Sequence, residues 1–81
     1  MISCEQHDYV EIACMYNYVI RITLKSGKRI EGVALDVKRN ESRQECLKIK
    51  VNNIECLFEL DSVSTMEAVA DNPHFKVVSF N

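Results

Sequence analysis

The chain contains one long run, residues 18–37, whose hydrophobic pattern strongly limits what it can fold into. In the first half of the run, large apolar side chains alternate with polar ones, and only Val19 breaks the alternation. The alternating apolar residues are Tyr18, Ile20, Ile22 and Leu24. A period of two is typical of a β-strand that has one buried and one solvated face. This half of the run therefore predicts a strand of a mainly β fold.

The second half of the run predicts a returning strand, so that the two halves form a β-hairpin. Ser26 and Gly27 predict a two-residue turn, because Gly adopts positive φ without a Cβ penalty. Apolar residues continue along the returning arm from Ile30 to Val37, interrupted by Gly32. A lone Gly inside a strand usually marks a bulge or a bend, which lets a long strand curl. We expect this hairpin to build most of a curled sheet.

At 81 residues the chain has the length of one domain with one modest core, and we predict a single domain over residues 1–81. No apolar run approaches the roughly 20 residues that are needed to span a bilayer. No basic segment precedes an apolar stretch at the amino terminus, as it would in a secretory signal. The expected location is cytoplasmic.

The sequence has 4 Cys, and without a secretory signal we expect them to be reduced. Their spacing lacks the close ligand pairs of a structural zinc site. The nearest approach to a metal site is the group Cys4, His7 and Cys14, with His74 as a candidate fourth ligand. The simpler interpretation is that the cysteines are small core residues. We expect no cofactor, and metal binding by this group stays open.

The net charge of −2 hides an uneven distribution along the chain. Residues 1–20 carry acidic side chains and no Lys or Arg, whereas residues 21–50 carry an excess of bases. Residues 51–81 are again acidic, with Lys76 as their one base. A nucleic-acid binder normally presents a basic face, while an acidic face suits a basic partner. The distribution favours a basic partner for the amino-terminal segment.

The amino-terminal stretch CEQHDYVEIACMY has helical spacing, with Tyr9, Ile12, Ala13 and Tyr16 at positions i, i+3, i+4 and i+7. Two pairs could form a capping box at the helix start, Ser3 with Gln6 or Asp8 with Glu11. We favour Asp8, which predicts a helix over about residues 8–16. The simplest role for the Asp8 and Glu11 carboxylates is to stabilise the positive end of the helix dipole, by roughly 0.3–1 kcal/mol each.

After the hairpin, the polar segment 38–44 predicts a loop and the remaining chain predicts short strands. The expected strands cover residues 45–51, 54–60, 63–69 and 75–80, with a turn at Asn52 and Asn53. Short strands at close spacing are typical of a sandwich or a barrel, and the bend at Gly32 favours the barrel. The predicted fold is a small, bent antiparallel β-barrel over about residues 18–80 with a short N-terminal α-helix.

Sequence motifs of catalysis are missing from the chain. There is no Gly-rich phosphate loop, no Ser, His and acid arrangement, and no strand-turn-helix setting for a nucleophile. A barrel of this size also offers little volume for a pocket that excludes water. We expect a binding module and not an enzyme.

Two resemblances say what such a module could bind. The hairpin segment VIRITLKSGKRIEG resembles the first motif of Sm-like proteins, which are small bent barrels with an N-terminal helix. The segments ISCEQHDYVEIAC, LDSVSTMEA and NPHF, taken together, resemble the Rof family of bacterial Rho-binding antiterminators. This second similarity extends over nearly the whole chain.

The Rof resemblance implies an inhibitor of transcription termination factor Rho. Such a protein binds the N-terminal RNA-binding region of Rho and prevents it from engaging nascent RNA. We expect a free monomer that does not bind nucleic acid directly. The resemblance places Asp8 and Glu11 against basic residues of Rho, Arg39 and Asn40 as secondary contacts, and Glu5 as a weaker one. The implied partner-binding set is Asp8, Glu11, Glu5, Lys38, Arg39 and Asn40.

The main alternative is an Sm-like RNA-binding ring subunit. Sm-like RNA binders place a Met-Asn or Phe-Asn pair three residues after an Asp, and an Arg-Gly pair near the end of the barrel. Here Asp36 is followed by VKRNESRQ, and residues 61–69 contain no Arg-Gly. These departures argue against uridine recognition and ring assembly. A third interpretation is a small scaffold or dimerisation barrel whose acidic ends only aid solubility.

Overall fold

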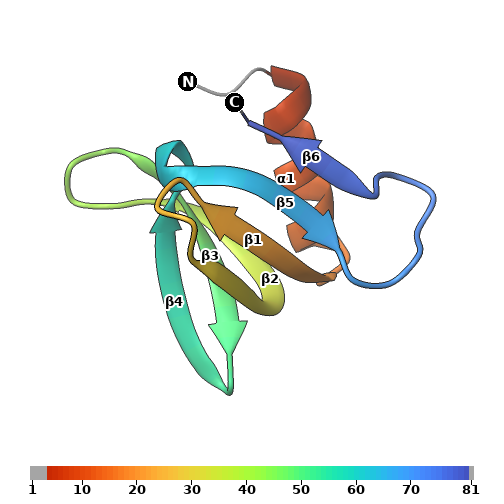
Figure 1. Cartoon of the computed structure of the whole chain (residues 1–81). Helices are drawn as coiled ribbons and strands as arrows, with labels where there is room; N and C mark the ends of the chain where they lie inside the picture. The colour runs from red at the N-terminus through yellow and green to blue at the C-terminus, as the bar shows by residue number, and fades with distance from the viewer. Residues whose placement is uncertain (1–3, 81) are drawn as a thin grey trace.

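The computed structural model describes residues 4–80, which contain one α-helix and six strands (Figure 1). Neighbouring strands are antiparallel and form one curved sheet in the order β4-β3-β2-β1-β5-β6. The elements are α1 (Cys4–Met15), β1 (Val19–Leu24), β2 (Arg29–Arg39), β3 (Glu45–Val51), β4 (Ile54–Glu59), β5 (Val63–Ala68) and β6 (Val77–Ser79). This confirms the mainly β fold class with an N-terminal helix. The expected closure into a barrel is not reached, because β4 and β6 remain the end strands of the described sheet.

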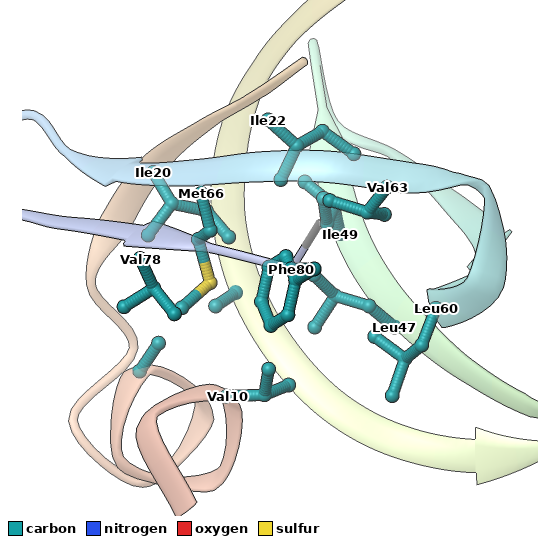
Figure 2. Close-up of a cluster of buried hydrophobic side chains, with 12 residues drawn as sticks. Val10, Ile20, Ile22, Leu47, Ile49, Leu60, Val63, Met66, Val78 and Phe80 are labelled. Atoms are coloured by element: carbon teal, nitrogen blue, oxygen red, sulfur yellow. The ribbon is translucent and has the colours of Figure 1, made fainter. Parts of the chain in front are cut away.

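The core lies inside the curve of the sheet, where α1 and β6 cover it (Figure 2). Val10 of α1 points toward Phe80, which follows β6. The largest fully buried side chains are Ile20, Ile22, Leu47, Ile49, Met66, Val10, Val63 and Cys46. Full burial of an aliphatic side chain contributes about 1.5–3 kcal/mol, so these side chains stabilise the fold substantially.

The first hairpin forms as the alternation predicts, with Ile20 and Ile22 fully buried on β1. Its turn is one residue longer than predicted. Leu24 is paired with Lys28, since the Leu24 amide donates to the Lys28 carbonyl at 2.8 Å. The connection is therefore a three-residue loop that ends on Gly27, which has a φ of 95°. A type I turn followed by a positive-φ residue is the usual geometry for this loop length.

Strand β2 lies very close to β3 at Gly32, and three residues later it carries a bulge. Gly32 pairs with Ile20 of β1 and packs closely against β3. The register with β3 shifts between Ala34 and Asp36, which leaves Leu35 as an extra residue on β2. Because a bulge interrupts side-chain alternation, residues on either side of it can face the same way.

The helix begins at Cys4 in the described part of the chain, earlier than the predicted start near Asp8. The alternative cap residue Ser3 lies outside the described residues. The buried helix positions are Val10 and Ala13, whereas Tyr16 of the predicted apolar stripe is 54% exposed. Within residues 4–80, no helix has the length and apolar character needed to cross a membrane.

A compact cap ends α1 and leads it directly into β1. The Tyr18 amide donates to the Ala13 carbonyl at 2.9 Å, and the Asn17 amide donates to Cys14 at 3.2 Å. Asn17 has a φ of 50°, so the cap is a Schellman motif with Asn in the left-handed position. The Asn17 side chain also donates to the Ala34 carbonyl at 3.0 Å, which ties the helix end to β2.

Asn17→Ala is expected to lower the free energy of unfolding by about 1–2 kcal/mol, because Ala is strained at positive φ and lacks the amide. Asn17→Gly should restore part of this loss, since Gly adopts the conformation freely. Urea denaturation followed by circular dichroism measures both variants. A Gly variant as unstable as the Ala variant would assign the effect to the side-chain hydrogen bonds alone.

Beyond the hairpin, β2 is longer than predicted and the loop is shorter. Lys38 and Arg39 are the last residues of β2, so the loop covers only residues 40–44. The turn at Asn52 and Asn53 forms as predicted, with φ values of 50° and 66°. The later strands lie within the predicted ranges, and a 3-10 turn over Leu60–Ser62 joins β4 to β5.

Candidate partner-binding surface

The three acidic residues of α1 are all exposed and follow one another at intervals of three along the helix. We name Glu5, Asp8 and Glu11 the acidic stripe. Because α1 begins at Cys4, only Glu5 lies in its first turn. The helix dipole acts mainly on the terminal turn, so it does not account for Asp8 and Glu11. Two carboxylates in the middle of the helix are therefore presented to solvent.

His7 connects the acidic stripe to the sheet. Its Nδ1 lies 3.4 Å from Glu11 Oε1, one helical turn further on. Its Nε2 lies 2.5 Å from Glu45 Oε2 at the start of β3. A neutral imidazole can donate to one of these carboxylates, whereas a doubly protonated ring can donate to both. The contact fixes the position of Glu11 relative to the first residue of β3.

The two basic residues of the candidate set, Lys38 and Arg39, are the last two residues of β2, and their side chains lie on opposite faces of the sheet. Arg39 pairs with Glu45 across the ladder, and Lys38 pairs with Cys46. Directly paired side chains lie on the same face of a sheet. Arg39 therefore shares the face on which Glu45 contacts His7, and Lys38 lies on the other face. The structure brings Arg39 near the helix and separates Lys38 from it.

Asn40 has a structural task in the loop after β2. Its side-chain Oδ1 accepts from the backbone amide of Gln44 at 3.0 Å, and its backbone amide donates to the backbone carbonyl of Gln44 at 3.0 Å. Its carbonyl accepts from the Arg43 amide at 2.9 Å, and Arg43 has a φ of 64°. Asn40 thus holds the loop in one conformation, and its contact with a partner stays a prediction.

Two residues of this surface were not predicted from the sequence, His7 as a bridge and Glu45. A signal existed for the first, because His7 and Glu11 are four apart and neighbours at that spacing interact on a helix. Glu45 gave no such signal, since its contact depends on how α1 packs against the sheet.

The cysteines do not assemble a metal site within residues 4–80. Cys4 is exposed, Cys14 and Cys56 are half-buried, and Cys46 is buried. The described residues contain no group of three or more His, Cys, Asp or Glu that could hold a metal ion. Instead, His7 faces the two glutamates and His74 stacks on Tyr16, with ring centroids 5.3 Å apart.

Comparison with known families decides the identity. Residues 1–80 match the family model described as "Modulator of Rho-dependent transcription termination (ROF)". The chain belongs to the Rof family. The structure "YaeO bound to Magnesium from Vibrio cholerae O395" is similar to it, with a TM-score of 0.87 and 40% sequence identity. The similarity covers 91% of this chain and 96% of that one. A search of curated proteins gives no significant match.

Membership of the Rof family makes the protein a modulator of Rho-dependent termination, and it implies Rho as the partner. The family is one of regulators and not of enzymes. The match to the family model also confirms the resemblance of the sequence motifs to the Rof family. None of these findings favours an Sm-like RNA-binding ring subunit.

Proposed function

We propose that the protein inhibits Rho-dependent termination by binding the N-terminal RNA-binding region of Rho and blocking its access to RNA. The observation that carries this proposal is the acidic stripe, in which Asp8 and Glu11 are exposed in mid-helix. A surface that binds RNA is rich in Lys and Arg. Carboxylates held on a rigid helix can occupy the same positive sites as phosphates and so compete with RNA.

Arg39, Asn40 and Lys38 act as secondary contacts in this proposal. Arg39 lies on the helix side of β2, which makes it the most direct extension of the acidic stripe. Asn40 contributes through the shape of the loop that it closes. Lys38 faces the other way and contacts Rho only at the rim.

The proposed inhibitor acts as a monomer in the bacterial cytoplasm, where Rho meets nascent RNA. It does not bind RNA itself, because its net charge is −2 and its exposed helix is acidic. Phosphates of RNA and the carboxylates of α1 repel one another. Inhibition is then competition for Rho and not sequestration of RNA.

The purified protein is expected to displace a fluorescent RNA from the isolated N-terminal region of Rho. Because the contact is electrostatic, its affinity should fall about tenfold or more between 50 mM and 200 mM salt. Fluorescence anisotropy follows RNA release, and a pull-down follows the protein complex. RNA that stays bound while the protein is also bound would refute competition. Binding of uridine-rich RNA by the protein alone would favour the Sm-like function.

A further inference from the structure

A groove lies between the second half of α1 and the second half of β2. It is lined by Glu11, Cys14, Met15, Leu35, Asp36 and Val37. All of the charge on these lining residues is negative, and the rest of the lining is apolar. Met15 is 70% exposed, so it forms an open apolar wall beside the Glu11 carboxylate. The groove is continuous with the acidic stripe through Glu11, which belongs to both.

The bulge in β2 shapes this groove. Leu35 and Asp36 are neighbours in sequence, and in a regular strand their side chains would point to opposite faces. The bulge at Leu35 interrupts the alternation, and the second half of β2 is not paired with β1. Both residues line the groove along this unpaired edge of β2. Asp36 Oδ1 accepts from the Val37 amide at 2.8 Å, which steadies the carboxylate. Lys48 lies opposite Asp36 and contacts Glu55 at 3.2 Å through its ammonium. Glu55 is the main cause of its raised pKa, and the charge of Asp36 adds to it, so Lys48 offsets part of the Asp36 charge.

Both carboxylates of the groove lie close enough to the Cys14 thiol to act on it electrostatically. Burial, and after it the negative charges of Asp36 and Glu11, together raise the pKa of Cys14 to about 11. A thiol between α1 and β2 thus experiences both carboxylates. Two negative charges beside the exposed Met15 and the half-buried Leu35 create an environment suited to a cation with an apolar stem.

We propose that this groove receives an arginine side chain of Rho, with Asp36 as a second carboxylate beside Glu11. The inference rests on the proposed function and extends the binding surface to β2. The aliphatic stem of the arginine packs on Met15 and Leu35. Its planar guanidinium has five donors and reaches carboxylates on both walls, whereas a compact lysine ammonium suits one.

The test begins with Asp36→Asn, which removes the charge and keeps an oxygen that can accept from the Val37 amide. Its affinity for Rho should fall about tenfold or more, because a guanidinium loses one of its carboxylates. The matched control is Glu31→Gln on the same strand, whose carboxylate lies 2.9 Å from Arg21 and not in the groove. Its affinity should stay within about twofold of the unaltered protein.

Two further measurements identify the groove and its occupant. Cys14 alkylation at pH 9, resolved by peptide mass spectrometry, should be faster in Asp36→Asn than in the unaltered protein, because the thiol pKa falls. Phenylglyoxal footprinting of Rho should show an arginine that the unaltered protein protects and that Asp36→Asn leaves reactive.

The outcomes separate the groove from the proposed function. If the unaltered protein binds Rho and Asp36→Asn binds equally well, the groove is refuted and the proposed function stands. If the unaltered protein protects no arginine of Rho from phenylglyoxal, the proposal that an arginine occupies the groove is wrong. An unaltered protein that does not bind Rho would overturn the proposed function and this inference together.

Discussion

Gly32→Ala is expected to lower the free energy of unfolding by about 2–3 kcal/mol, the upper part of the range for overpacking a well-packed core. A Cβ at this position would lie 2.5 Å from the Lys50 carbonyl oxygen and 2.6 Å from Ile49 Cγ2. The first of these is a backbone atom of the neighbouring strand, so relief requires β2 and β3 to separate. Urea denaturation gives the free energy from the midpoint and the slope.

The matched control is Gly27→Ala, which changes the other glycine of the chain. Nothing lies within 4 Å of a Cβ at Gly27, and its φ of 95° makes the cost one of conformation alone. We expect a loss of about 1 kcal/mol there. If Gly32→Ala were no more destabilising than Gly27→Ala, the close approach of β2 to β3 would be wrong.

Side-chain alternation was sufficient to predict most of the sheet, because it depends on the local chain. Leu47 and Ile49 are buried on β3 as their period of two predicts. The Asn52 and Asn53 turn followed from the tolerance of Asn for positive φ. Gly32 marked the place where another backbone comes close, here the Lys50 carbonyl of β3.

Element boundaries depended on tertiary contacts that the sequence does not display. Asp8 and Glu11 have the spacing of a capping box, yet the helix already runs through them. Its first turn is held against β6, since the Gln6 side chain donates to the Ser79 carbonyl at 2.6 Å. Lys38 and Arg39 are polar and read as a loop, but β3 supplies a ladder that keeps them in β2. Local polarity predicts solvent exposure and does not predict where strand pairing stops.

The part of the candidate site on α1 was predictable from the sequence, whereas the part on β2 and β3 was not. The charge pattern identified the acidic stripe directly, because helix neighbours are fixed by spacing. The pairing of Arg39 with Glu45 depends on strand register, and the position of Asp36 depends on a one-residue bulge. Both are set by how the whole sheet pairs, so residues on β2 and β3 could not be assigned to a common surface.

Reversing the charge of the acidic stripe with Asp8→Lys and Glu11→Lys together is expected to abolish inhibition of Rho-dependent termination. Affinity for Rho should fall by about 100-fold or more, because like charges then face each other across the interface. The fold should persist, since both side chains are exposed and Lys favours helix. The lost contact of Glu11 with His7 is a surface ion pair, which contributes about 1 kcal/mol or less.

Transcription with purified Rho on a terminator template measures inhibition, and thermal denaturation measures the fold. The matched control is Glu31→Lys with Glu55→Lys, which changes the net charge equally and breaks surface ion pairs to Arg21 and Lys48. This control should still inhibit Rho. Equal loss in both double variants would mean that overall charge, not the helix, controls binding. Continued inhibition by the Asp8 and Glu11 variant would remove α1 from the interface, and binding would then have to involve another surface of the sheet.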